Sequence, residues 1–300
     1  MSLFGDAEEW QLTVGAQTWS GLVWGSVQDP PALLLHGWLD NAGSLAPLAR
    51  LLPGRKRWLP DLPGHGRSGH RPPGTFYHLV DYVGDVLALA QALGLERFDL
   101  IGHSLGGAIA TLIAAAYPER IRRLVLIEAL GPLARPATEA AQDLRRAIDA
   151  RLALDEKQLK VHPDRASAVR LRMQANGLSE TAADTLIERA LMPAPGGYVW
   201  RSDPRHTLPT PVRGTESQYL ALLGAITAPT LLVLADPPTP YLHGHDAARR
   251  MEALRPRQVL RVPGNHHLHL EHPAAVAGAV AAFLGEPHCE VAAGGDPYGP

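Results

Sequence analysis

The stretch that decides the fold is residues 100–107, which read LIGHSLGG. An apolar run typical of a buried strand ends at Ile101, and small and apolar residues that favour a helix follow Ser104. Glycines stand two positions before and two positions after this serine, and they let the backbone turn so tightly that the hydroxyl stays exposed. The pattern predicts a nucleophilic serine, which in turn requires an oxyanion hole upstream and an acid and a histidine downstream.

Segments typical of strands recur along the chain, and helical patterns separate them. The alternating segments Trp10–Val14 and Gln17–Trp24 predict an antiparallel opening of a sheet. Buried strands are predicted at Ala32–Leu35, Arg57–Leu59, Phe98–Ile101, Leu124–Ile127, Thr230–Leu234 and Val259–Val262. Helices are predicted over Tyr77–Leu93, Leu105–Tyr117 and Pro273–Phe283. This alternation predicts an α/β fold with a mostly parallel, eight-stranded sheet and helices on both faces.

The alternation breaks in a segment rich in arginine and alanine. Ser179 is placed to cap a helix there, and the runs Pro193–Gly197 and Pro204–Pro211 predict loops. Clefts in α/β folds open at the carboxyl ends of the strands, so we expect this segment to be a cap over the substrate. The predicted division is an α/β core at 1–130 and 215–285, a helical cap at 131–214 and a disordered tail at 286–300.

Composition narrows the functional classes. The formal net charge of the chain is −2, so no basic excess points to nucleic acid. No apolar run approaches the roughly 20 residues that cross a bilayer. The single cysteine, Cys289, excludes an internal disulfide, and Met1–Glu9 lacks the pattern of a signal peptide. We expect a cytoplasmic protein with a small-molecule substrate; the oligomeric state is not indicated.

A candidate oxyanion loop, His36–Asn41, follows the first buried strand. Gly37 lets this loop bend so that the backbone N–H of Trp38 faces the nucleophile, and the N–H of Leu105 would be the second donor. Two such donors stabilise the negative oxygen of a tetrahedral intermediate, at ~3 kcal/mol each. The alternative is that the glycine only begins a tight turn.

Two other segments invite ligand-binding interpretations. The glycine-rich run Asp61–Ser68 lacks the lysine of a phosphate-binding loop, so we assign it a structural role. The segment Gly264–Pro273 follows the last strand and holds a cluster of histidines, but no acid or cysteine is spaced convincingly with them as a metal ligand. A loop histidine at this place is what a serine nucleophile requires, and spacing alone leaves the choice open between His266 and its neighbours.

The chain resembles the α/β-hydrolase superfamily over nearly its whole length up to the tail. The resemblance rests on four motifs in the expected order, which are His36–Trp38, Asp61–Ser68, Gly102–Gly106 and Gly264–His266. Within the superfamily it is similar to the serine hydrolase-like group, on the segments His36–Asn41, Arg71–Gly74 and Gly264–His269. The resemblance implies that the base is His266, five positions before Glu271.

The acid departs from the superfamily pattern. The usual acid follows the seventh strand, where this chain reads Leu234–Pro240 and offers Asp236 next to two prolines. Some relatives, including certain haloalkane dehalogenases, carry the acid after the sixth strand, where this chain has Glu128. We favour Glu128 as the partner of His266 and keep Asp236 as the alternative.

The resemblance implies a serine hydrolase that needs neither a cofactor nor a metal. It would cleave a carboxylic ester or related acyl substrate through an acyl-enzyme on Ser104, and a carboxylesterase is the favoured class. Epoxide hydrolases and haloalkane dehalogenases use aspartate at this position, so the serine argues against both. The alternatives are a serine-dependent C–C hydrolase, lactonase, thioesterase or perhydrolase, or a non-catalytic ligand-binding homologue.

Overall fold

A computed structural model of the protein describes residues 3–154, 161–242 and 244–285. The predicted disordered tail, residues 286–300, lies outside the described residues. Among the described residues, no helix is long and apolar enough to cross a membrane.

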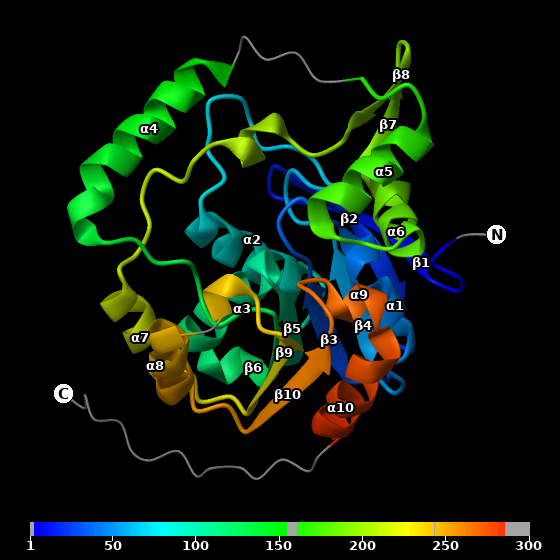
Figure 1. Cartoon of the computed structure of the whole chain (residues 1–300). Helices are drawn as coiled ribbons and strands as arrows, with labels where there is room; N and C mark the ends of the chain where they lie inside the picture. Colours follow the sequence, from blue (N-terminus) through cyan, green and yellow to red (C-terminus); the bar gives the residue numbers. More distant parts are fainter. Residues whose placement is uncertain (1–2, 155–160, 243, 286–300) are drawn as a thin grey trace.

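Eight strands of the described chain form one sheet in the order β1-β2-β4-β3-β5-β6-β9-β10 (Figure 1). Strand β2 pairs antiparallel with β1 and β4, and the other neighbours pair parallel. The strands are β1 (Glu8–Val14), β2 (Gln17–Trp24), β3 (Pro31–Leu35), β4 (Lys56–Pro60), β5 (Phe98–His103), β6 (Ile121–Ile127), β9 (Thr230–Asp236) and β10 (Gln258–Pro263). The predicted α/β fold with a mostly parallel sheet is confirmed.

Helices cover both faces of this sheet. One face packs against α2 (Leu79–Ala92), α3 (Leu105–Ala116), α7 (Glu216–Gly224) and α8 (Gly244–Leu254), and the other packs against α1 (Ala46–Arg50), α9 (Leu268–Glu271) and α10 (Pro273–Gly285). Successive side chains of a strand point to opposite faces. In β3, Leu33 and Leu35 accordingly join one apolar cluster while Leu34 joins the other. This double burial explains why the central strands are continuous apolar runs.

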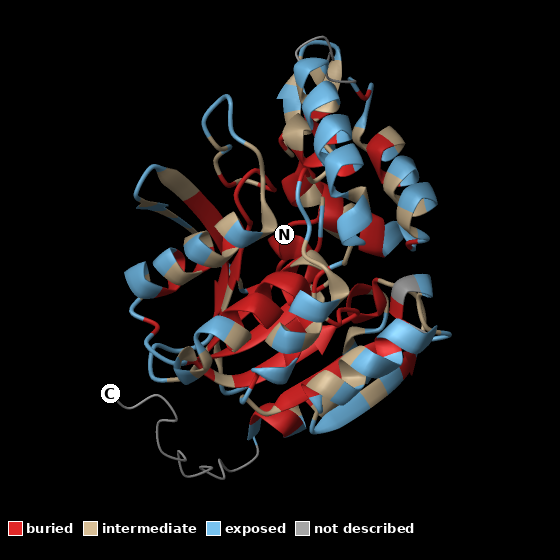
Figure 2. Cartoon of the chain, turned by 90° about the vertical axis from the view of Figure 1, so that its left-hand side faces the viewer, coloured by how far each residue is buried: buried red, intermediate tan, exposed pale blue. Residues whose placement is uncertain are grey.

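We call residues 131–214 the cap segment after the prediction; its described parts, residues 131–154 and 161–214, come between β6 and β9 in the chain, and their helices lie on the side of the carboxyl ends of the parallel strands (Figure 1). Their helices are α4 (Ala140–Leu152), α5 (Arg165–Asn176) and α6 (Glu180–Ala190). Ser179 caps α6 as predicted, because its side chain accepts a hydrogen bond from the N–H of Ala182. Figure 2 shows buried residues gathered in the sheet and the helices against it, and exposed residues on the outer sides of the cap helices.

The predicted loop at Pro193–Gly197 is wrong in part. The structure has a hairpin of β7 (Leu191–Ala194) and β8 (Gly197–Trp200) there, with Pro195 and Gly196 as its turn. A proline inside a run argues against a strand, but it is tolerated in an edge strand, and this sheet has only two strands within the described chain. In the second predicted loop, residues Pro204–Thr207 form the short 3-10 helix η5.

The cap segment is joined to the core by polar groups removed from water. Arg189 of α6 pairs with Asp61 at 2.7 Å, and neither side chain has exposed surface. Asn41 Nδ2 donates to the carbonyl oxygen of Leu186 in the same helix at 2.8 Å. A buried charge without its partner is costly, so these contacts hold α6 at one position on the core.

We therefore expect Arg189→Met to lower the free energy of unfolding by about 3–5 kcal/mol, because it leaves the carboxylate of Asp61 buried without its main counter-charge. Urea denaturation followed by circular dichroism would measure the change. Arg145→Met is the matched control, since Arg145 is 86% exposed and its pair with Asp149 spans 3.7 Å. Equal stability of the two variants would show that the buried pair does not anchor the cap segment.

Candidate active site

Ser104 stands at the sharp turn between β5 and α3. Its backbone has φ 50° and ψ −111°, and residues other than glycine rarely adopt such a positive φ. A Cβ atom on Gly102 would lie 2.4 Å from the carbonyl oxygen of Gly106, and a Cβ on Gly106 would lie 2.1 Å from that of Leu35. Only glycine permits these approaches, and the turn leaves the Ser104 side chain partly exposed at the carboxyl edge of the sheet.

His266 lies on the loop after β10, and its Nδ1 atom is 3.2 Å from Oε2 of Glu128. Glu128 follows the end of β6 and is fully buried. Its Oε1 accepts the N–H of Ala235 at 2.6 Å, and its Oε2 accepts the hydroxyl of Thr239 at 2.9 Å. These donors fix the direction of the carboxylate, so that it can hold a proton on His266 Nδ1 and leave Nε2 for chemistry.

The structure separates the two candidate acids. Glu128 is brought to His266, whereas Asp236 is solvent-exposed at the end of β9. This geometry favours Glu128 as the acid. Sequence reasoning missed Thr239, whose hydroxyl orients Glu128, and the only signal for it was its place in the loop after β9.

The loop of His266 is held against the turn that carries Ser104. His103, which precedes the serine, donates from Nε2 to the carbonyl oxygen of His266 at 2.8 Å, and the two imidazole rings lie 4.8 Å apart. Because Ser104 directly follows His103, the predicted nucleophile and the predicted base belong to touching segments.

The predicted oxyanion donors lie on two segments that also touch. The N–H of Gly106 donates to the carbonyl oxygen of His36 at 3.0 Å, and a Cβ on Gly37 would lie 2.8 Å from His103 Nδ1. Leu105 is the first residue of α3, where backbone N–H groups have no partner within the helix. Within the described residues, the backbone N–H groups of Trp38 and Leu105 donate to no other protein group, whereas the indole N–H of Trp38 donates to the carbonyl oxygen of His206 at 3.1 Å. Both backbone N–H groups are therefore available to a negative oxygen.

His36 braces the oxyanion loop as a neutral imidazole. Its Nδ1 donates to the carbonyl oxygen of Gly37 at 2.8 Å, and its Nε2 accepts the N–H of Leu62 at 2.9 Å. Complete burial lowers the pKa of His36, although Asp61 acts in the opposite direction. The Asp61–Ser68 run holds the end of the same loop, because Asp61 Oδ1 accepts the N–H of Ala42, the residue that follows the loop, at 2.7 Å.

The other histidines of the base segment are not arranged around a metal. His267 Nε2 lies 3.2 Å from Asp40 Oδ2, and His269 Nε2 lies 2.9 Å from the hydroxyl of Ser44. No group of three or more side chains within the described residues has the geometry to hold a metal ion.

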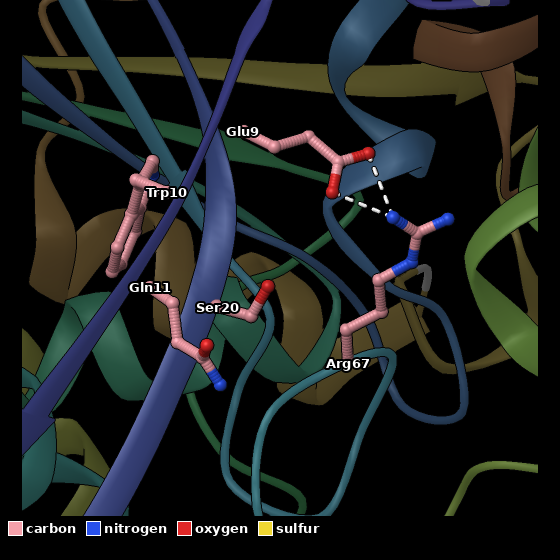
Figure 3. Close-up of a pocket in the computed structure, with 5 residues that line it drawn as sticks. All are labelled: Glu9, Trp10, Gln11, Ser20 and Arg67. Atoms are coloured by element: carbon pink, nitrogen blue, oxygen red, sulfur yellow. Dashed lines mark hydrogen bonds and ion pairs between the residues drawn. The ribbon is translucent and has the colours of Figure 1, made fainter.

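A surface cavity of about 270 Å³ lies along β1 and β2 (Figure 3). Glu9, Trp10, Gln11, Ser20 and Arg67 line it, and Arg67 Nη1 donates to both carboxylate oxygens of Glu9 at 2.8 and 2.6 Å. No predicted site residue lines this cavity, and its main charges neutralise each other.

The fold and this constellation define a class of protein. The family model described as the alpha/beta hydrolase fold matches residues 30–273, so the chain belongs to the α/β-hydrolase fold family. The predicted superfamily is thereby confirmed.

Individual relatives narrow the group. A "Serine hydrolase-like protein" of Danio rerio is 35% identical over 93% of this chain and 88% of its own length. A "Probable serine hydrolase" of Drosophila melanogaster is 31% identical over 93% and 88%. These relatives confirm the predicted likeness to the serine hydrolase-like group.

Two solved structures share the fold closely. A hypothetical protein from Pseudomonas aeruginosa superposes with a TM-score of 0.87 and 41% identity, covering 92% of this chain and 98% of that one. The thioesterase domain from the curacin biosynthetic pathway has a TM-score of 0.80 and 30% identity, covering 92% and 99%.

Proposed function

We propose that this protein is a serine hydrolase that cleaves a carboxylic ester or related acyl compound through an acyl-enzyme on Ser104. The observation that carries the proposal is the contact between the buried Glu128 carboxylate and His266 Nδ1 at 3.2 Å. The loop that carries His266 also touches the turn that carries Ser104. A histidine oriented in this way is what activates a serine hydroxyl. The membership of the α/β-hydrolase fold family supports the same class of chemistry.

In the proposed mechanism, Ser104 Oγ attacks the substrate carbonyl carbon while His266 Nε2 accepts the hydroxyl proton. The N–H groups of Trp38 and Leu105 bind the oxyanion. His266 then protonates the leaving group as the tetrahedral intermediate collapses to the acyl-enzyme. Water, deprotonated by His266, attacks the acyl carbon, and His266 returns the proton to Ser104 Oγ as the second tetrahedral intermediate collapses to the carboxylic acid and free Ser104. Glu128 keeps the proton on Nδ1 and stabilises the imidazolium in both halves of the reaction.

The cap segment, residues 131–214, would supply the contacts that select the acyl and leaving groups. Its helices stand over the carboxyl edge of the sheet, where the proposed nucleophile lies. The proposed reaction needs no cofactor or metal. We also propose a cytoplasmic location, because a chain with a single cysteine fits a reducing compartment.

A thioester is the second candidate substrate. The thioesterase domain from the curacin pathway is 30% identical to this chain over nearly its whole length. The same residues can attack a thioester carbonyl, because only the leaving group changes, so ester and thioester substrates belong in one assay panel.

A fluorophosphonate probe tests the proposal directly. We expect the folded protein to be labelled at Ser104, to hydrolyse p-nitrophenyl butyrate or a butyryl thioester, and to lose both properties in Ser104→Ala. Peptide mapping by mass spectrometry would locate the adduct. A folded protein that takes up no probe at Ser104 and turns over neither substrate would instead be a non-catalytic member of the fold family.

A further inference from the structure

We infer that Asp40 is a positioning residue for the proposed reaction, because its carboxylate joins three parts of the molecule. These parts are the oxyanion loop (residues 36–41), the base loop (residues 264–269) and helix α5 of the cap segment. The inference rests on the proposed function and adds to it: the relative placement of base and oxyanion donor depends on one buried carboxylate and on an arginine from the cap.

Asp40 is 2% exposed and is surrounded by hydrogen-bond donors. Its Oδ2 accepts the hydroxyl of Ser44 at 3.1 Å and lies 3.2 Å from His267 Nε2, while Oδ1 accepts from Arg172 Nη2. Burial alone would raise the pKa of Asp40, but His267, Arg172 and His103 hold its pKa well below the ordinary value. The carboxylate is therefore a buried anion that depends on these partners.

The contact between Asp40 and His267 affects the position of the proposed base, His266. His267 directly follows His266, and its own N–H donates to Oδ1 of Asn265 at 2.8 Å. The carbonyl oxygen of His266 is held by His103 at 2.8 Å. The backbone of the base is thus fixed on one side by His103 and on the other by the His267–Asp40 contact. A shift of about 1 Å in a reacting group can cost roughly 10²-fold in rate, so this restraint has kinetic weight.

The backbone of Asp40 holds the turn that carries the proposed oxyanion donor, the N–H of Trp38. Its N–H donates to the carbonyl oxygen of Gly37 at 3.2 Å and closes the turn that contains Trp38 and Leu39. Leu39 has a φ of 58°, which a residue with a side chain adopts only when its surroundings hold it there. One residue therefore closes the turn that presents the Trp38 N–H and, through its side chain, restrains the neighbour of His266.

The cap segment completes this arrangement at the corner between α5 and α6. Asn265 Nδ2 donates to the carbonyl oxygen of Gly177 at 2.9 Å, and the N–H of Ser179 donates to Oε1 of Glu271 at 2.7 Å. Leu270 packs among the apolar residues of the two cap helices. The base loop is thus held between the core and the cap segment, and the ion pair between Arg172 and Asp40 joins the cap segment to this arrangement.

Replacing His267 separates positioning from packing. His267→Phe keeps the ring but removes the donor to Asp40, whereas His267→Gln offers an amide N–H near the place of Nε2. We expect the phenylalanine variant to lose about 10- to 100-fold in kcat with KM changed less than about threefold, and the glutamine variant to stay within about threefold of the natural kcat. Asp40→Asn should lose kcat as His267→Phe does. Steady-state kinetics and thermal unfolding would be measured on the same preparations.

A matched arginine pair on α5 tests the cap's part. Arg172→Gln removes the link to Asp40, and we expect a loss of about tenfold in kcat. Arg170→Gln is the control, because Arg170 is an exposed arginine of the same helix and we expect its kcat to be unchanged.

Labelling of Ser104 by the fluorophosphonate probe distinguishes the possible failures. An unlabelled natural protein would overturn the proposed function and this inference with it. If the natural protein is labelled, but Asp40→Asn and His267→Phe react at its rate and keep its kcat, the positioning role is refuted while the function stands. If His267→Gln and His267→Phe lose kcat equally and both unfold at lower temperatures, the contacts of Asp40 have only a structural role. Should Asp40→Asn fail to fold, the two His267 variants still decide between these outcomes.

Discussion

Glu128→Gln is expected to lower kcat by about 10³- to 10⁴-fold and to leave KM nearly unchanged. An amide in place of the carboxylate can present its NH₂ group to His266 Nδ1. This orientation favours the tautomer with its proton on Nε2, which cannot accept the serine proton. It also removes the charge that stabilises the imidazolium. The amide oxygen can still accept the N–H of Ala235, so the variant should fold. Steady-state hydrolysis of p-nitrophenyl butyrate would measure the loss.

Asp236→Asn is the matched control, since Asp236 is exposed at the end of the neighbouring strand. We expect its kcat to stay within about threefold of that of the natural protein. The opposite ranking of the two variants would identify Asp236 as the acid, and it would mean that the Glu128–His266 contact has only a structural role.

The choice between these acids shows where sequence reasoning reaches its limit. Strands β6 and β9 are parallel neighbours, with Ile127 paired to Val233, so both candidate acids lie near the same edge of the sheet. What separates them is the direction of the side chain and its burial, which depend on the fully folded chain. The strands themselves were predictable because leucines such as Leu33 and Leu34 are buried on opposite faces, and a continuous apolar run records that burial.

The cap segment was harder to predict for a related reason. Arg165, Arg170 and Arg172 look alike in the sequence, yet Arg170 is exposed while Arg172 reaches the buried carboxylate of Asp40. The hairpin β7–β8 contains Pro193, a residue that argues against a strand unless the strand is an edge. Neither feature leaves a periodic signal, because Arg172 depends on one long-range contact and each strand of the hairpin has only four residues.

Acidification from pH 7 to pH 5 is expected to destabilise the fold strongly, because several imidazoles are buried as neutral groups. Burial lowers the pKa of His206 to about 4 and that of His269 to about 3. Burial likewise lowers the pKa values of His36, His65 and His103. In the unfolded chain, histidines titrate near pH 6.5, so below that pH the unfolded state binds more protons than the folded state and stability falls. Each histidine that stays neutral in the fold lowers the free energy of unfolding by about 2 kcal/mol over this range. Several together approach the 5–15 kcal/mol that stabilises a typical domain.

Urea denaturation at pH 7, 6 and 5 would measure how steeply the free energy of unfolding depends on pH, and single replacements would show which histidines cause this dependence. His206→Phe should make the pH dependence shallower by the share of one histidine, because it removes a buried imidazole whose Nε2 has no hydrogen-bond partner within the described residues. His245→Gln is the control, since the side chain of His245 is 83% exposed and its replacement should leave the slope unchanged. A free energy of unfolding that stays constant between pH 7 and pH 5 would mean that the buried histidines take up protons in the folded protein as readily as in the unfolded chain. That result would also refute the assignment of His36 as a neutral imidazole with one nitrogen donating and the other accepting.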